Sequence, residues 1–77
     1  MSEFNIVIQS FRDIQTFIST ATVQPFQVLV GNEAQLVNAK SFIGMVSLDY
    51  SRPLKVLCNG DSDSVKRFCQ QVRQFLA

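Results

Sequence analysis

The segment VNAKSFIGMVSL, residues 37–48, is the most informative stretch of this 77-residue chain for its fold. The first residues of this segment are the end of a run in which apolar and polar residues alternate. Ser41 then precedes a mostly apolar stretch, which is the position of an N-cap before a helix. At helical spacing Met45 and Leu48 share one face, while the other apolar residues of this run fall on another face. The segment therefore predicts the end of a strand followed by a short, two-faced helix over residues 42–48.

Outside this segment, apolar and polar residues alternate in four runs, and two longer runs have apolar residues at helical spacing. Ser10 and Asp13 have the spacing of a capping box at the start of the first helix. Residues 31–32 and 59–61 have turn composition. The expected strands are residues 3–9, 26–30, 33–38 and 54–58, and the expected helices begin at Ser10, Ser41 and Asp61.

The order of these elements is β-α-β-β-α-β-α, and each element has one apolar side. One face of a single sheet should therefore carry the helices, while the other face meets water. We expect an open-faced α/β sandwich, in the α+β sense, that forms one domain over residues 1–77. A chain of this length leaves no room for a deep enclosed active site, so an enzyme is not expected.

The composition argues against several classes of function. Hydrophobic residues make up 47% of the chain and charged residues 17%, which favours a globular fold. The formal net charge is +1 and the basic residues are spread along the chain, so we expect no nucleic-acid partner. The start of the chain lacks a signal peptide, and no apolar run approaches the roughly 20 residues that cross a bilayer. We therefore expect a cytoplasmic protein without membrane contact.

The two cysteines, Cys58 and Cys69, form either a disulfide or two reduced, buried thiols. The absence of an export signal favours thiols. A structural zinc site needs about four nitrogen or sulfur ligands, and two sulfurs without any histidine do not supply them. We expect no metal, no cofactor and no catalytic residue.

Residues 37–48 closely resemble the regulatory-serine segment of HPr proteins from Gram-positive bacteria, which belong to the bacterial sugar phosphotransferase system. The order of strands and helices along the rest of the chain is also similar to the order in that family. The resemblance implies an HPr-like open-faced β-sandwich, with a four-stranded antiparallel sheet and three helices on one face. It also implies a role connected with sugar transport.

In HPr proteins, a histidine at the start of the first helix takes a phosphoryl group from enzyme I and passes it to enzyme II proteins, and an arginine steadies the phosphate. The resemblance places Ser10 at the histidine position, Arg12 at the arginine and Asp13 at the usual proline, after a shorter loop. Ser10 is either a helix cap or a phosphoryl acceptor. A serine without an adjacent base is a weak nucleophile, and its phosphoester is too stable to pass the group on, which favours the cap.

The serine of HPr that matches Ser41 is phosphorylated by the ATP-dependent HPr kinase, and the product binds the catabolite-control repressor. A catabolite-repression paralogue in the family lacks the histidine and retains this serine. Free backbone N–H groups at the start of the 42–48 helix would receive a phosphate there, and Lys40 adds a nearby charge. Ser41 is therefore either an N-cap alone or an N-cap that is also phosphorylated.

Phe42, Ile43 and Val46 match the apolar positions with which HPr proteins contact enzyme I, the kinase and the repressor. These side chains either form a docking surface or pack partly into the core. Arg12 either points into solvent or pairs with a phosphate on Ser41 or with a carboxylate of a partner.

We expect a non-catalytic HPr-like adaptor or regulatory protein that docks through the 42–48 helix and responds to phosphorylation of Ser41. Its partners would be HPr kinase, a catabolite-control repressor or components of the phosphotransferase system. The alternatives are a phosphocarrier with a non-histidine acceptor and a degenerate paralogue without a partner. The protein is either a monomer or a weak dimer, because three aliphatic residues are expected on the outer face of the sheet: Val7, Leu29 and Leu57.

Overall fold

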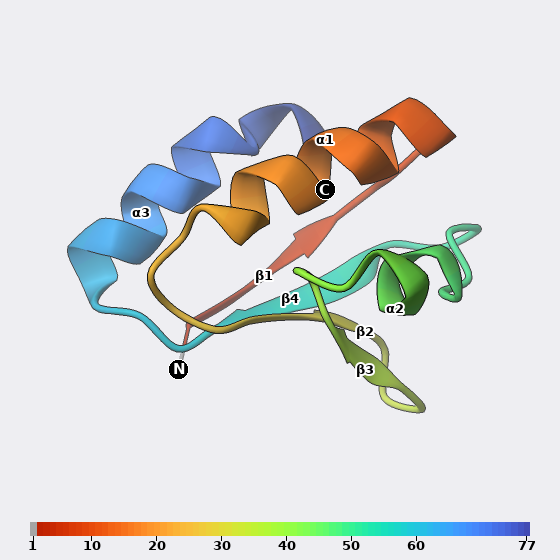
Figure 1. The fold of residues 1–77 in the computed structure, drawn as a ribbon, viewed down its shortest axis with the longest axis horizontal. Coiled ribbons are helices and arrows are strands. Elements are labelled where there is room, and N and C mark those ends of the chain that lie inside the picture. Colours follow the sequence, from red (N-terminus) through yellow and green to blue (C-terminus); the bar gives the residue numbers. More distant parts are fainter. Residues whose placement is uncertain (1) are drawn as a thin grey trace.

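The computed structural model describes residues 2–77, and their elements follow the predicted β-α-β-β-α-β-α order, with a short 3-10 helix at the end. The helices form one layer over the sheet (Figure 1). In chain order the elements are β1 (Ser2–Ile6), α1 (Phe11–Thr22), β2 (Val28–Gly31), β3 (Leu36–Asn38), α2 (Phe42–Val46), β4 (Leu54–Cys58), α3 (Ser62–Gln71) and the 3-10 helix η1 (Arg73–Phe75).

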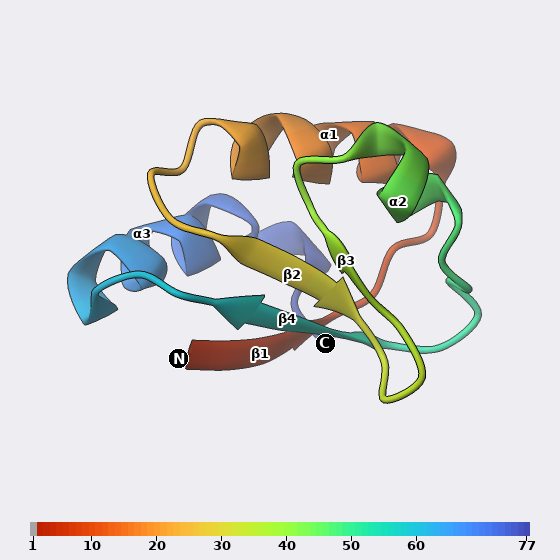
Figure 2. The same ribbon diagram turned by 60° about the horizontal axis from the view of Figure 1, so that its bottom comes forward.

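The four strands form an antiparallel sheet in the order β1-β4-β2-β3 (Figure 2). The pairs Ile6–Leu54 and Val30–Val56 set the register, and their side chains point to the covered face. The end of the chain pairs with the C-terminal part of the outer edge of β1, because Val7 N–H donates to the carbonyl oxygen of Phe75 at 2.7 Å and Ala77 N–H donates to that of Asn5 at 3.0 Å. This part of the sheet edge is therefore not free to pair with another chain.

β4 has the predicted bounds and β2 is displaced by one or two residues, whereas β1 and β3 differ more from the alternating runs that predicted them. β1 ends at Ile6 because its partner strand begins at Leu54, although Ile8 is still buried. β3 begins only at Leu36 because the preceding residues form a turn, in which Asn32 Oδ1 accepts hydrogen bonds from two backbone N–H groups. Strand length thus depends on the pairing partner and on turn geometry as well as on alternation.

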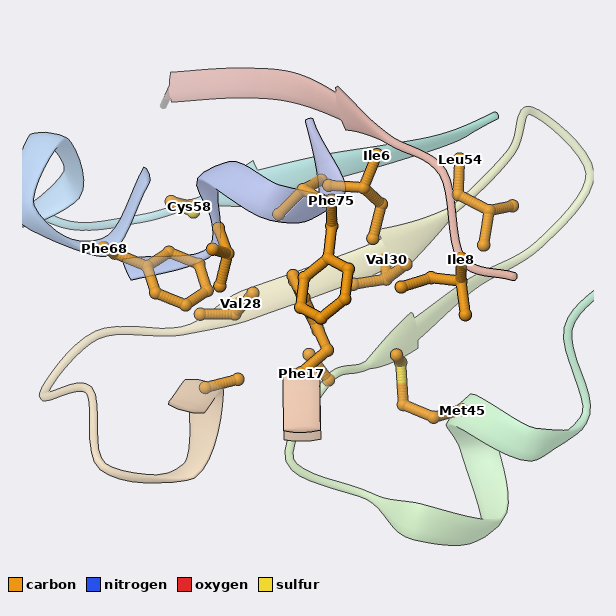
Figure 3. Close-up of a cluster of buried hydrophobic side chains, with 14 of the residues drawn as sticks. Ile6, Ile8, Phe17, Val28, Val30, Met45, Leu54, Cys58, Phe68 and Phe75 are labelled. Carbon is orange, nitrogen blue, oxygen red and sulfur yellow. The ribbon is translucent and has the colours of Figure 1, made fainter. Parts of the chain in front are cut away.

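The core contains residues from all three helices and from one face of the sheet (Figure 3). Phe68 of α3 makes edge-to-face contacts with the rings of Phe4, Phe17 and Phe26, at centroid distances of 6.1, 5.8 and 5.8 Å. Phe17 of α1 makes a similar contact with Phe75 of η1. These rings hold α1, α3 and the sheet together.

Helix α2 is attached to the core through one face only. Met45 is fully buried and Leu48, just after the helix, is buried as well, whereas Ile43 is 80% exposed. The two faces predicted for residues 42–48 are therefore confirmed, but the helix ends at Val46, two residues before the predicted end, with Ser47 as its C-cap. The Tyr50 hydroxyl donates a hydrogen bond to the carbonyl oxygen of Met45 and ties the following loop to the helix.

The outer face of the sheet carries Leu29, Leu57 and Val7, which are each partly exposed. An ion pair between Lys55 and Glu3, with a distance of 3.6 Å, crosses the same face. The oligomeric state stays a prediction. Among residues 2–77, no helix is long and apolar enough to cross a membrane.

Replacement of Phe68 by alanine should lower the free energy of unfolding by about 3–5 kcal/mol, because the change leaves a cavity between three other rings. Leu48→Ala should cost about 2–5 kcal/mol for the same reason. Ile43→Ala is the matched control and should leave stability nearly unchanged, since its side chain is exposed. Urea denaturation of the three variants measures these differences, and a large loss for Ile43→Ala would contradict the assignment of its face.

Candidate functional site

The start of α1 is closed by side chains of the chain itself. Ser10 is the N-cap, and its Oγ accepts a hydrogen bond from the backbone N–H of Asp13 at 3.1 Å. The carboxylate of Asp13 accepts in turn from the backbone N–H of Gln9 at 3.2 Å. The predicted capping box is therefore confirmed. The Asp13 carboxylate accepts its hydrogen bond from Gln9, the residue before the cap, rather than from Ser10. Asp13 also places a negative charge at this end of the helix.

Ser41 is the N-cap of α2, as the sequence predicts. Its backbone is extended, and its Oγ accepts a hydrogen bond from the N–H of Gly44 at 3.2 Å. Gly44 itself fits tightly, because an added Cβ would lie 3.2 Å from the Cβ of Val37 and 3.4 Å from the Oγ of Ser41. The Ser41 side chain is exposed to solvent. The cap is confirmed, and phosphorylation of Ser41 stays a prediction.

Lys40 has a structural contact that the sequence did not indicate. Its Nζ donates a hydrogen bond to the carbonyl oxygen of Gln24, just after the C-terminal end of α1, at 2.8 Å. A cation at this end of a helix is favourable for the helix dipole. Lys40 thus connects the end of α1 to the loop before α2. Its ammonium group is engaged in this hydrogen bond and is not a free positive charge beside Ser41.

The exposed apolar residues of α2 form a continuous surface with the first residue of α1. Phe42 and Val46 are 47% and 40% exposed, beside the more exposed Ile43. Phe11 is 54% exposed, and its ring makes an edge-to-face contact with that of Phe42 at a centroid distance of 5.9 Å. We call these four residues the α1–α2 surface.

Phe11 was missed by reasoning from the sequence. A signal was present, because this large apolar residue follows the N-cap directly and lies off the buried stripe of Ile14, Phe17 and Ala21. Its neighbour Arg12 is exposed. Within residues 2–77, Arg12 forms no side-chain hydrogen bond and no ion pair. The guanidinium group of Arg12 is therefore free to contact a partner, but it does not contact Ser41 in this structure.

A shallow groove of about 560 Å³ lies beside Ser10 and Phe11. Among residues 2–77, no basic residue lines the groove, so these residues offer no positive charge to a phosphate there. The Tyr50 hydroxyl at its edge is engaged with Met45, and burial raises the pKa of Tyr50 to about 12, which keeps the phenol protonated at neutral pH. The full lining is Val7, Ile8, Gln9, Ser10, Phe11, Ile14, Tyr50 and Ser51.

The two cysteines also provide no reactive nucleophile. Both are free thiols in the structure, as the sequence favoured, but only Cys58 is buried; the prediction that Cys69 is buried too is wrong, because its side chain is partly exposed. Cys58 is buried, and the burial together with the nearby Cys69 raises its pKa to about 11; burial raises the pKa of Cys69 as well. A thiol with a raised pKa stays protonated at neutral pH and is a poor nucleophile.

Comparison with known proteins identifies the fold. No protein-family model and no curated protein matches the sequence. The chain is similar to the crystal structure of HPr-C-His from Thermoanaerobacter tengcongensis, with a TM-score of 0.76 and 28% sequence identity over 96% of this chain and 93% of that chain. This chain has an HPr-like fold. The four-stranded antiparallel sheet with three helices, expected from the resemblance, is confirmed.

Ser41 variants test the cap of α2. Ser41→Ala should lower the free energy of unfolding by about 1 kcal/mol, because the N–H of Gly44 loses its acceptor. Ser41→Asp should retain stability or raise it by a few tenths of a kcal/mol, because it keeps a capping oxygen and adds a favourable charge. Urea denaturation at neutral pH measures both, and equal stability of the alanine variant and the unchanged protein would argue against the cap.

Proposed function

We propose that this chain is a non-catalytic HPr-like adaptor related to the phosphotransferase system, which binds partner proteins through the α1–α2 surface and is regulated by phosphorylation of Ser41. The observation that carries the proposal is the concentration of exposed apolar side chains around the Ser41 cap. Four of the seven large hydrophobic residues exposed among residues 2–77 belong to this surface. Clustered exposed apolar side chains with aromatic members are typical of protein interfaces.

Several features argue against a role as a phosphoryl carrier. The chain contains no histidine. The Ser10 oxygen at the corresponding position is engaged in the helix cap, and the carboxylate of Asp13 repels an incoming phosphate. No cation lines the groove next to Ser10. Docking without phosphoryl transfer therefore accounts better for this arrangement than transfer to another acceptor.

Regulation at Ser41 is supported by its position. The hydroxyl is exposed, and it lies directly before Phe42 and Ile43 of the α1–α2 surface. A phosphate at this residue would add charge and strong acceptor oxygens to the edge of an apolar surface. Arg12, adjacent to Phe11 and without an ion pair among residues 2–77, has the fork geometry to hold such a phosphate or a carboxylate of the partner.

Incubation with phosphoenolpyruvate and enzyme I should leave the chain unlabelled, because it has no imidazole and its Ser10 oxygen caps a helix. Intact-mass measurement checks this, with an HPr protein from a Gram-positive bacterium as the positive control. An enzyme-I-dependent, acid-labile adduct on any residue would show that the chain is a carrier with a non-histidine acceptor.

Phosphorylation by an HPr kinase and ATP should occur on Ser41 and should tighten binding to a catabolite-control repressor by about tenfold or more. Calorimetry on the phosphorylated and unmodified proteins measures the gain. Arg12→Ala should reduce the gain, whereas Arg52→Ala, in the loop before β4, should not. Equal binding of both forms, or no binding, would remove the repressor as the regulated partner.

A further inference from the structure

A second concave surface lies at the junction of α3 and η1, on elements other than those of the α1–α2 surface. Helix α3 ends at Gln71, and after Val72 the chain continues as the tighter η1 helix. An open groove of about 520 Å³ lies where the two helices meet. Helices α2 and α3 are set apart in both views of the fold (Figures 1 and 2). The groove is lined by Arg67, Gln70, Gln71, Arg73 and Gln74, and we call it the α3–η1 groove.

The groove is positively charged. Two of its five residues are arginines, and no acidic residue occurs anywhere in residues 64–77. Neither guanidinium forms an ion pair within residues 2–77. Arg67 is partly fixed, because its Nη2 donates to the Oγ of Ser64 at 3.2 Å, which leaves its other donors available.

The glutamines provide neutral hydrogen-bonding groups beside these charges. The Oε1 of Gln71 accepts a hydrogen bond from the Nε2 of Gln24 at 2.9 Å, so its amide N–H groups remain free to donate. Gln70 and Gln74 can each donate and accept. This combination matches a peptide backbone, which presents both donors and acceptors, together with acidic side chains.

The same features disfavour a small phosphate ion. The groove lies at the C-terminal end of α3, where the helix dipole does not stabilise an anion of any kind, so an anionic ligand has to be held by the two guanidinium groups. The groove is also open and much larger than a single phosphate, and all five of its residues are exposed. Carboxylates distributed along an extended segment fit the two separated guanidinium groups better.

We infer that the α3–η1 groove binds an acidic segment of a second protein, held by Arg67 and Arg73 through its carboxylates and by the glutamines through its backbone. The chain then has two separate binding surfaces, one apolar and one basic. This inference does not depend on which protein binds the α1–α2 surface, or on phosphorylation of Ser41.

Titration of the ¹⁵N-labelled chain with a synthetic glutamate-rich peptide at low ionic strength tests the inference. The amide shifts should be confined to the segment around residues 64–76, and a glutamine-rich peptide of equal length should cause none. The double variant Arg67→Gln, Arg73→Gln should bind the peptide at least about tenfold more weakly, because two charge-assisted contacts are lost. Ile43→Ala should bind the peptide as the unchanged protein does.

The double variant Arg52→Gln, Lys55→Gln is the control for net charge, because it also removes two positive charges, of which that of Lys55 is paired with Glu3, at positions outside the groove. It should retain peptide binding. If both double variants lost the same amount of peptide affinity, the binding would depend on net charge alone, and the inference would be overturned. Absence of shifts in the segment around residues 64–76 would do the same. If inorganic phosphate caused the same amide shifts with a similar affinity, the groove would be a simple anion site, and the inference of an acidic protein segment would be overturned.

Discussion

The burial of Met45 is the interaction on which the outer surface of this protein depends. A helix as short as α2 can place only one narrow face against the core, and that face is taken by Met45. The adjacent apolar side chains of Phe42, Ile43 and Val46 must then point outward. The Ser41 cap and the hydrogen bond from Tyr50 keep the helix in this orientation. The exposed apolar surface is thus a consequence of how α2 is anchored.

The sequence predicts those parts of the fold that depend on local patterns. The faces of α2, the caps at Ser10 and Ser41 and the order of the elements all follow from spacing and residue type, and all are confirmed. Contacts between distant residues could not be predicted in this way. The pairing of Phe11 with Phe42 depends on how α1 and α2 pack, and so does the hydrogen bond from Lys40 to the end of α1.

The α3–η1 groove could not be predicted from the sequence, for a different reason. The apolar stripe of the last helix continues past Val72 to Phe75, and both side chains are buried, so spacing alone predicts one continuous helix. The change to a 3-10 helix keeps Phe75 in the core, where its ring contacts Phe17. The arginines and glutamines on both sides of this change line the groove. Backbone geometry, rather than composition, creates this feature.

A competition assay distinguishes docking like an HPr protein, without uptake of the phosphoryl group, from the alternatives. Phosphoryl transfer from phosphorylated enzyme I to an HPr protein of a Gram-positive bacterium is measured with increasing amounts of this chain. We expect inhibition that is competitive with HPr. Ile43→Glu should clearly reduce the inhibition without affecting folding, because the Ile43 side chain is exposed. No inhibition in large excess, or equal inhibition by that variant, would rule out docking through the α1–α2 surface.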